Sequence, residues 1–339
     1  MSRKSTIQIK DIYRFKIPAE PAVSPDGKQI VFTVERMDKK DQAYYKNIYL
    51  INTNGRHQKQ LTFGKRNDQS PMWSPDGQWI AFIRKQDTAY QIWLLPKKGG
   101  EAKPLTKLPR GSISYFRWSP EGKRILFLFH PLSKEAQVDK NGKISTPVYR
   151  HIKDIWYRLD GEGFFDSENT HIWLANAKSG ATKQLVFGDF EDANPCWSPD
   201  GKEIAFITSR EKDWRHRLEE QDIYRVSIES GTLKKLKTPA GPKGGGLSYS
   251  PNGKTIAYIG HDRPYKGWGV INFILNTVSL SGKNHRQYRD VFDRTAIMLT
   301  IGDITPSFVM TPPLWSRDGQ SIYYGISSNG RQHILKHQL

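Results

Sequence analysis

A short turn flanked by apolar runs constrains the fold of this 339-residue chain more than any other feature. Its clearest copy spans residues 196–208, where Ser198-Pro199-Asp200-Gly201 separates two strand-like stretches. Proline presets φ at the second turn position, aspartate suits the third, and glycine accepts the fourth. The apolar run that follows, residues 204–207, has the length of a strand. The segment therefore reads as strand, turn, strand.

This unit occurs six times. The other five turns are Ser24-Pro25-Asp26-Gly27, Ser74-Pro75-Asp76-Gly77, Ser119-Pro120-Glu121-Gly122, Ser250-Pro251-Asn252-Gly253 and Ser316-Arg317-Asp318-Gly319. Their serines are separated by 50, 45, 79, 52 and 66 residues. A base period near 45–50 residues with insertions is typical of radially repeated four-stranded sheets. The sequence therefore predicts an all-β chain, a β-propeller with six recognisable four-stranded blades.

The repeats also give a domain plan. Residues 1–19 form a polar lead-in and residues 20–339 form the propeller, with no hydrolase domain expected. An aromatic-rich insertion, residues 130–170, interrupts the third blade; it is either a functional loop or a hairpin that widens the blade. The sixth blade stops at a third strand, residues 333–339, and is therefore predicted to be incomplete. The exposed edge that results would be a liability for aggregation or a docking edge for a protein partner.

Composition narrows the classes of partner. The formal net charge of +18 favours anionic partners, but the cations are spread over loops and no nucleic-acid-binding motif is present, so a nucleic-acid role is not expected. No apolar stretch is long enough for a membrane segment or a secretory signal, so we expect no membrane association and a cytoplasmic location. The single cysteine, Cys196, falls on an inner strand and is expected to be buried and inert.

Aromatic residues recur at fixed repeat positions. Trp73, Trp118, Trp197 and Trp315 directly precede the turn serine in four of the repeats. Aromatic residues at equivalent positions most simply fill the space between neighbouring blades, and we expect packing here and not ligand stacking.

The sequence contains none of the common catalytic or cofactor-binding motifs that we considered. The chain contains no G-x-S-x-G elbow, no H-E-x-x-H pair, no P-loop and no dinucleotide-binding glycine pattern, so we predict no catalytic, metal-binding or cofactor-binding residues. Two acidic residues remain as site candidates. Glu191 and Asp192 precede the fourth inner strand, and Asp68 is the repeat equivalent of Asp192. Their carboxylates either lie near a propeller opening and bind an amine, or cap a loop.

The six repeats resemble the TolB-type propeller repeat. Asp11-Ile12-Tyr13 ahead of the first turn is similar to the start of acylaminoacyl-peptidase-like members of the prolyl oligopeptidase family. The insertion carrying Tyr157-Arg158-Leu159-Asp160-Gly161-Glu162-Gly163 and the connection with Asp303 resemble the same members. In that family the propeller caps an α/β-hydrolase domain, restricts access to short peptides and helps to hold the amino end of the substrate.

The resemblance implies a function that this chain cannot perform alone. It predicts the non-catalytic, substrate-gating propeller portion of a serine peptidase, with a hydrolase domain and a peptide substrate as partners. Glu191 and Asp192 are then candidates for contacts with the amino end of the substrate. The alternative is a stand-alone propeller that acts as a protein-interaction module. By itself the chain is not expected to be an enzyme.

Overall fold

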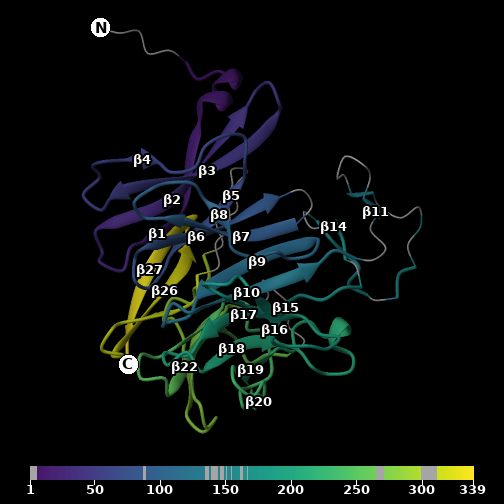
Figure 1. Cartoon of the computed structure of the whole chain (residues 1–339). Coiled ribbons are helices and arrows are strands. Elements are labelled where there is room, and N and C mark those ends of the chain that lie inside the picture. The colour runs from purple at the N-terminus through teal and green to yellow at the C-terminus, as the bar shows by residue number, and fades with distance from the viewer. Residues whose placement is uncertain are drawn as a thin grey trace. The chain divides into compact units, whose positions relative to one another are not determined.

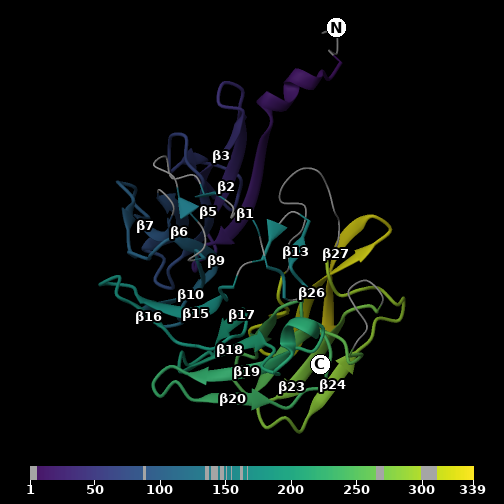
Figure 2. The ribbon, with the colours of Figure 1, turned by 90° about the vertical axis from the view of Figure 1, so that its right-hand side faces the viewer.

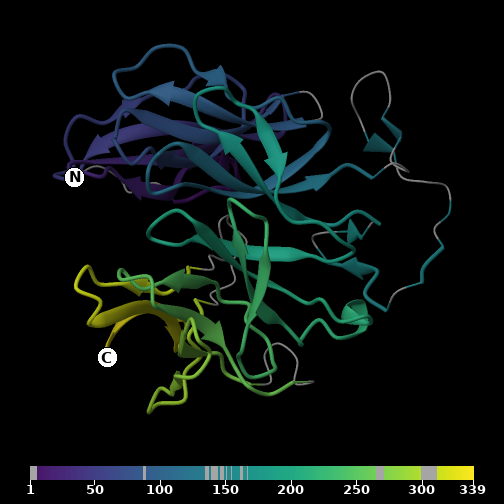
Figure 3. The same cartoon turned by 60° about the horizontal axis from the view of Figure 1, so that its bottom comes forward.

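The computed structural model describes residues 6–86, 89–133, 137–138, 144–145, 149, 151–153, 155–160, 163–165, 167–264, 271–298 and 311–339. These residues form strands and turns, with two short 3-10 helices, η1 (Ile9–Arg14) and η2 (Trp214–His216) (Figure 1, Figure 3). The prediction of an all-β chain is confirmed. The chain divides into two compact units: the first is Met1–Trp118, Gly122–Ile125 and Ala175–Thr182, and the second is Ser119–Glu121, Leu126–Leu174 and Lys183–Leu339.

The first two repeats lie in the first unit, and each provides four antiparallel strands in chain order. These are β1 (Lys16–Val23), β2 (Gln29–Asp38), β3 (Ala43–Asn52) and β4 (Lys59–Gln60), then β5 (Asp68–Trp73), β6 (Trp79–Gln86), β7 (Ala89–Pro96) and β8 (Lys103–Pro104). The first strand begins at Lys16, directly after η1, so the expected lead-in of residues 1–19 includes the start of β1.

The third repeat has strands in both units, and one parallel bridge, between Ala89 of β7 and Gly111, joins its first strand to the strands of the second repeat. They are β9 (Gly111–Trp118), β10 (Arg124–Pro131), β15 (His171–Asn176) and β16 (Thr182–Gln184). The insertion between β10 and β15 holds two small hairpins, β11 (Gln137–Val138) with β12 (Ile144–Ser145), and β13 (Arg158–Leu159) with β14 (Gly163–Phe164). Much of residues 134–166 lies outside the described residues.

The remaining repeats lie in the second unit. Their strands are β17 (Asp192–Trp197), β18 (Glu203–Thr208), β19 (Asp222–Ser227) and β20 (Leu233–Leu236), then β21 (Leu247–Tyr249), β22 (Thr255–Gly260), β23 (Ile274–Ser279) and β24 (His285–Tyr288), and last β25 (Leu314–Trp315), β26 (Ser321–Ser328) and β27 (Arg331–Gln338). Figure 2 shows β17 to β20 side by side in chain order. Among the described residues, the sixth repeat thus contributes three strands.

The repeated turn is held by its own side chains. Ser198 Oγ donates to Asp200 Oδ1 at 2.6 Å, and Asp200 Oδ1 accepts the backbone N–H of Lys202 at 3.1 Å. The Glu203 N–H then donates to Ser198 Oγ at 3.0 Å, which starts the next strand. Gly201 has φ of +68°, a conformation that glycine adopts at little cost. The same three bonds recur in the turns that begin at Ser24, Ser74, Ser250 and Ser316.

Neighbouring sheets pack face to face through the repeated apolar positions. Between the first two sheets, Val31 and Ile48 of one contact Trp73, Ile80 and Phe82 of the other, and all five side chains are buried. Trp73 Nε1 also donates to Ala22 O of the preceding inner strand at 3.1 Å. Equivalent clusters join the fourth sheet to the fifth and the fifth to the sixth. The packing role expected for the repeated aromatic position is confirmed for Trp73.

The turns of neighbouring sheets are also in contact. A Cβ placed at Gly77 would lie 3.6 Å from Pro25 Cδ in the turn of the preceding repeat. The same contact joins four further pairs, Gly122 with Pro75, Gly201 with Pro120, Gly253 with Pro199, and Gly319 with Pro251. The proline and the glycine of the motif therefore shape a joint between sheets as well as a turn.

We predict that Asp200→Ala lowers the free energy of unfolding by about 1–2 kcal/mol, because two hydrogen bonds of the turn are lost. Asp200→Asn should cost less than about 0.5 kcal/mol, since Asn252 makes the same two bonds in the fifth repeat. Urea denaturation of both variants checks this. Equal losses in both variants would contradict the account of the turn.

Candidate functional site

The two predicted site residues are adjacent in the chain but differ in environment. Asp192 is the first residue of β17, and Glu191 precedes it in the connection from the third repeat. The side chain of Asp192 is fully buried, and Glu191 is partly buried. They therefore have to be considered separately.

The Asp192 carboxylate is buried, and each of its oxygens has a side-chain hydrogen-bond partner. His171 Nδ1 donates to Asp192 Oδ2 at 2.9 Å, and Arg210 Nη2 donates to Oδ1 at 3.2 Å. The Arg210 guanidinium in turn lies over the rings of Phe190 and Tyr224, 5.1 and 5.4 Å from their centroids. Both oxygens thus have cationic or imidazole partners, and the carboxylate does not face solvent.

The second repeat contains the same arrangement. Asp68 is the first residue of β5, and Arg84 on β6 binds it with two bonds, Nε to Oδ1 at 2.6 Å and Nη2 to Oδ2 at 2.9 Å. The Arg84 guanidinium lies 4.6 Å from the ring centroid of Trp93 on β7. Asp68 and Asp192 are therefore inner-strand residues in buried ion pairs, and the expectation that they cap a loop is wrong for both.

Glu191 is partly buried and is hydrogen-bonded to Thr170. Its Oε2 accepts the backbone N–H of Thr170 at 3.0 Å, and Thr170 Oγ1 lies 3.2 Å from His130 Nδ1. Burial raises the pKa of the Glu191 carboxyl above its ordinary value. A partly buried carboxylate of this kind is able to bind an ammonium group, which would restore its charged form.

Sequence analysis missed a polar cluster beside Glu191. Arg215 on η2 binds Asp189 with two bonds, of 2.8 and 3.1 Å, and Asn169 Nδ2 donates to the same carboxylate at 2.9 Å. These bonds lower the pKa of Asp189 to about 2. Trp214 Nε1 donates to Asp189 O at 2.7 Å, so the cluster fixes the backbone two residues before Glu191. The partners are 20–46 residues apart in sequence, and no local pattern indicates them.

A buried lysine was also missed. Lys243, before β21, has no exposed surface, and its ammonium donates to the carbonyl oxygens of Gln221, Pro239 and Gly241. The last two distances are both 3.0 Å. Burial lowers the pKa of the Lys243 ammonium to about 8. Through these hydrogen bonds Lys243 links the segment before β19, in the fourth repeat, to the connection that leads into the fifth repeat.

Cys196 and the insertion complete the sequence-derived candidates. Cys196 lies on β17 and packs against the apolar cluster of the fourth and fifth sheets. The residue is only partly buried, which is less than expected, but its thiol is enclosed, and this burial raises the pKa of the thiol above its ordinary value. In the insertion, Tyr157, directly before β13, and Phe164 on β14 have ring centroids 6.2 Å apart, and both side chains are exposed. Gly161 and Glu162 there, and Asp303 in the later connection, lie outside the described residues.

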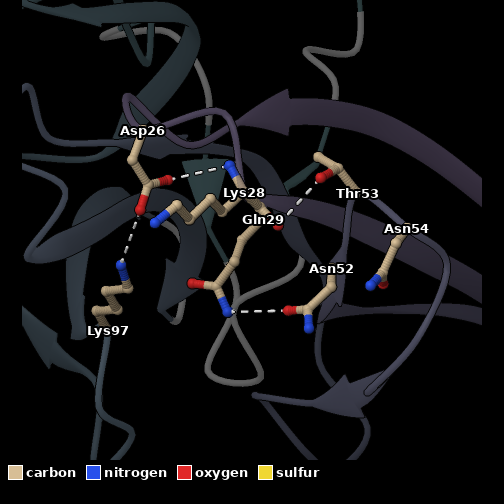
Figure 4. A pocket seen from close by; sticks show the side chains of 7 residues that line it. All are labelled: Asp26, Lys28, Gln29, Asn52, Thr53, Asn54 and Lys97. Atoms are coloured by element: carbon tan, nitrogen blue, oxygen red, sulfur yellow. Dashed lines mark hydrogen bonds and ion pairs between the residues drawn. The ribbon is translucent and has the colours of Figure 1, made fainter.

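A pocket in the first unit lies among the turns of the first two repeats. Its volume is about 490 Å³, and polar and charged residues line it (Figure 4). The residues that line it are Asp26, Lys28, Gln29, Asn52, Thr53, Asn54 and Lys97. Asp26 belongs to a repeated turn and also pairs with Lys97 at 3.8 Å. These groups serve the turns, and nothing in their arrangement indicates catalysis.

The part of the chain that the structure describes contains neither a cluster of potential metal ligands nor a helix that could span a membrane. Within those residues, no three His, Cys, Asp or Glu side chains are placed to share a metal ion. No helix in the same part of the chain has the length and apolar character needed to cross a membrane.

We predict that Asp192→Ala destabilises the protein by about 3–5 kcal/mol, because the Arg210 charge is left buried without its partner. Glu191→Gln should cost less than about 1 kcal/mol, since an amide oxygen still accepts the Thr170 N–H. Denaturant titration of the two variants provides the test. Comparable losses would show that both acids are structural.

We further predict a pH effect from Lys243. Its folded pKa, about 8, lies below the value of about 10.4 in an unfolded chain, so between these values the unfolded state binds more protons and stability rises with pH. Relative to Lys243→Met, the wild type should gain on the order of 1 kcal/mol between pH 7 and pH 9. Lys254→Met, at an exposed position, is the control. If the wild type instead lost stability relative to Lys243→Met over this pH range, the three hydrogen bonds to carbonyl oxygens would have a larger effect on the pKa of Lys243 than burial has.

The chain was compared with known proteins. Residues 4–147 match the family model described as the TolB beta propeller domain. An uncharacterized peptidase, YuxL, of Bacillus subtilis is 30% identical over 206 residues, which cover 60% of this chain and 31% of the relative. Dipeptidyl-peptidase 5 of Porphyromonas gingivalis is 28% identical over 263 residues, covering 72% and 37%. The chain therefore spans about a third of the length of these relatives.

Solved structures agree on the fold. The acylaminoacyl peptidase of Pyrococcus horikoshii matches with a TM-score of 0.67 at 17% identity, over 97% of this chain and 46% of that one. The β-propeller domain of the trilobed protease from Pyrococcus furiosus matches with a TM-score of 0.61 at 16% identity, over 96% and 82%. The predicted β-propeller is confirmed. The chain carries a TolB-type β-propeller domain that is related to the propeller regions of proteins named as peptidases.

Proposed function

We propose that this chain is the non-catalytic, substrate-gating propeller portion of a serine peptidase of the prolyl oligopeptidase family. It would act in proteolysis only together with a hydrolase half. The main support is the match to the acylaminoacyl peptidase, which covers nearly all of this chain but less than half of that enzyme. The lengths of the peptidase-named relatives are consistent with the same division.

The proposal assigns a substrate contact to Glu191. Its carboxylate is partly buried, and one of its oxygens accepts the Thr170 N–H. The backbone two residues earlier is fixed, because the Asp189 carbonyl oxygen accepts a hydrogen bond from Trp214. Asp192 contributes indirectly, because its bonds to His171 and Arg210 hold the start of β17. Glu191 is therefore the member of the predicted pair that would meet the amino end of a peptide, and Asp192 is a positioning residue.

We predict that the purified chain does not hydrolyse aminoacyl or acyl-peptide chromogenic substrates, and that it binds a dipeptide amide with a free amino end more tightly than its N-acetyl form. Glu191→Gln should weaken that binding about tenfold, or about 1.4 kcal/mol, because the ion pair is lost. A chromogenic assay measures the hydrolysis, and isothermal titration calorimetry measures the binding of both dipeptides. Glu229→Gln, at an exposed position, is the control for Glu191→Gln.

Two results would count against this function. Hydrolysis by the purified chain that an organophosphate inhibitor of serine hydrolases abolishes would end the non-catalytic assignment. Equal binding of the free and acetylated dipeptides would end the assignment of Glu191.

A second candidate function is a stand-alone protein-interaction module. The observation that favours it is the outer strand of the last sheet. Among the described residues β27 is paired on one side only, with β26, so the backbone groups of its other edge face outward. Co-purification of a stoichiometric partner without a hydrolase fold would favour this function, and a cytoplasmic location would suit either one.

A further inference from the structure

The third strand of each repeat has an equivalent apolar residue, which is buried in the first five repeats and exposed in the sixth. Ile48, Ile92, Ile172, Ile223 and Leu275 have no exposed surface. The equivalent residue of the sixth repeat, Ile334 on β27, is 71% exposed. The cross-strand register supports the equivalence, because Ile334 faces Gly325 on β26 as Ile223 faces Ile207 on β18.

A leucine–threonine step covers this position in the first two repeats. The Leu61 N–H donates to Ile48 O at 2.8 Å, and the Ile48 N–H donates to Thr62 Oγ1 at 2.9 Å. Leu105 and Thr106 bind Ile92 in the same way, at 2.8 and 3.0 Å. In the third repeat the Leu185 N–H donates to Ile172 O at 2.8 Å. The chain thus shows the chemistry that satisfies the outward N–H and C=O of this position.

The sheet face beside Ile334 is also less covered than its equivalents. Tyr323 on β26 is 36% exposed, whereas Val31, Ala81, Leu126, Ala205 and Ala257 at the same repeat position have no exposed surface. Leu314 on β25 is 55% exposed. The last sheet therefore offers an apolar face next to an open strand edge, and strand addition satisfies both requirements at once.

Charge indicates which strand fits. β27 carries the cations Arg331 and Lys336 together with His333 and His337, and it contains no carboxylate. The fourth strands of the first three sheets carry lysines themselves, at Lys59, Lys103 and Lys183. A strand with those lysines would place like charges opposite each other on β27, whereas acidic residues would form favourable cross-strand pairs.

We propose that the edge of β27 binds an extended segment of a separate polypeptide, one with a Leu-Thr step flanked by acidic residues. The segment adds as a fourth strand: its leucine N–H and threonine hydroxyl bind Ile334, and its leucine side chain covers the exposed isoleucine. This inference rests on the second candidate function, since it names the partner chemistry of that same edge.

The test uses fluorescein-labelled peptides and the whole 339-residue chain. The first peptide is residues 57–64 of this chain with Lys59→Glu, and the comparison peptides are the unchanged residues 57–64 and the acidic peptide with Leu61→Asp. Fluorescence anisotropy should show saturable binding of the acidic peptide, at least fivefold weaker binding of the unchanged one, and none of the Leu61→Asp form. Ile334→Asp in the protein should weaken binding of the acidic peptide at least tenfold, while Ile7→Asp, at another exposed isoleucine, should not change that binding.

Three outcomes would overturn the inference. The first is no binding of any peptide. The second is concentration-dependent dimerisation of the chain that Ile334→Asp abolishes, because a second copy would then occupy the edge. The third is a native partner that binds Ile334→Asp as tightly as wild type; it would leave the interaction function standing and remove only its assignment to β27.

Discussion

Each sheet of this protein depends on the sheets next to it. A four-stranded antiparallel sheet with apolar side chains on both faces cannot bury either face alone, and burial of one Phe or Ile stabilises the fold by about 1.5–3 kcal/mol. Here the Ile and Phe positions of one repeat, such as Ile80 and Phe82, pack on the small or branched positions of the repeat before it, such as Val31. The turns of the two repeats are also in contact, through Pro25 of one and Gly77 of the next. The repeated motif therefore encodes a joint between sheets.

The same logic explains the buried polar groups and part of the charge. Asp68 pairs with Arg84 on the second strand of its sheet, and Asp192 pairs with Arg210, just after the second strand. Each guanidinium also lies on an aromatic ring of the third strand. Cations recur on the outer strands at equivalent, exposed positions, namely Lys59, Lys103, Lys183, Lys234 and Arg286. Lysine and arginine on an edge strand oppose edge-to-edge pairing, so a share of the net charge of +18 has a structural reason.

Features with a local pattern could be predicted, and features that need tertiary contacts could not. The turn chemistry at Ser198 and the packing role of Trp73 follow from short motifs, and the structure contains both. Asp68 and Asp192 were recognised as equivalent, but their partners were not. The available signal was an arginine late in the second strand or just after it, Arg84 within β6 and Arg210 two residues beyond β18. Lys243 and the cluster at Asp189 depend on residues up to 46 positions away, so no window of sequence indicates them.

Hydrogen exchange at the third strands measures the dependence of each sheet on its neighbours most directly. If a fourth strand and a following sheet protect the central residue, the amides of Ile48, Ile92, Ile172, Ile223 and Leu275 should exchange slowly. The amide of Ile334, which lacks both covers in the described structure, should exchange at least about a hundredfold faster in the same sample. Equal protection at all six positions would contradict the account, because the last sheet would then be as stable without a cover as the others are with one.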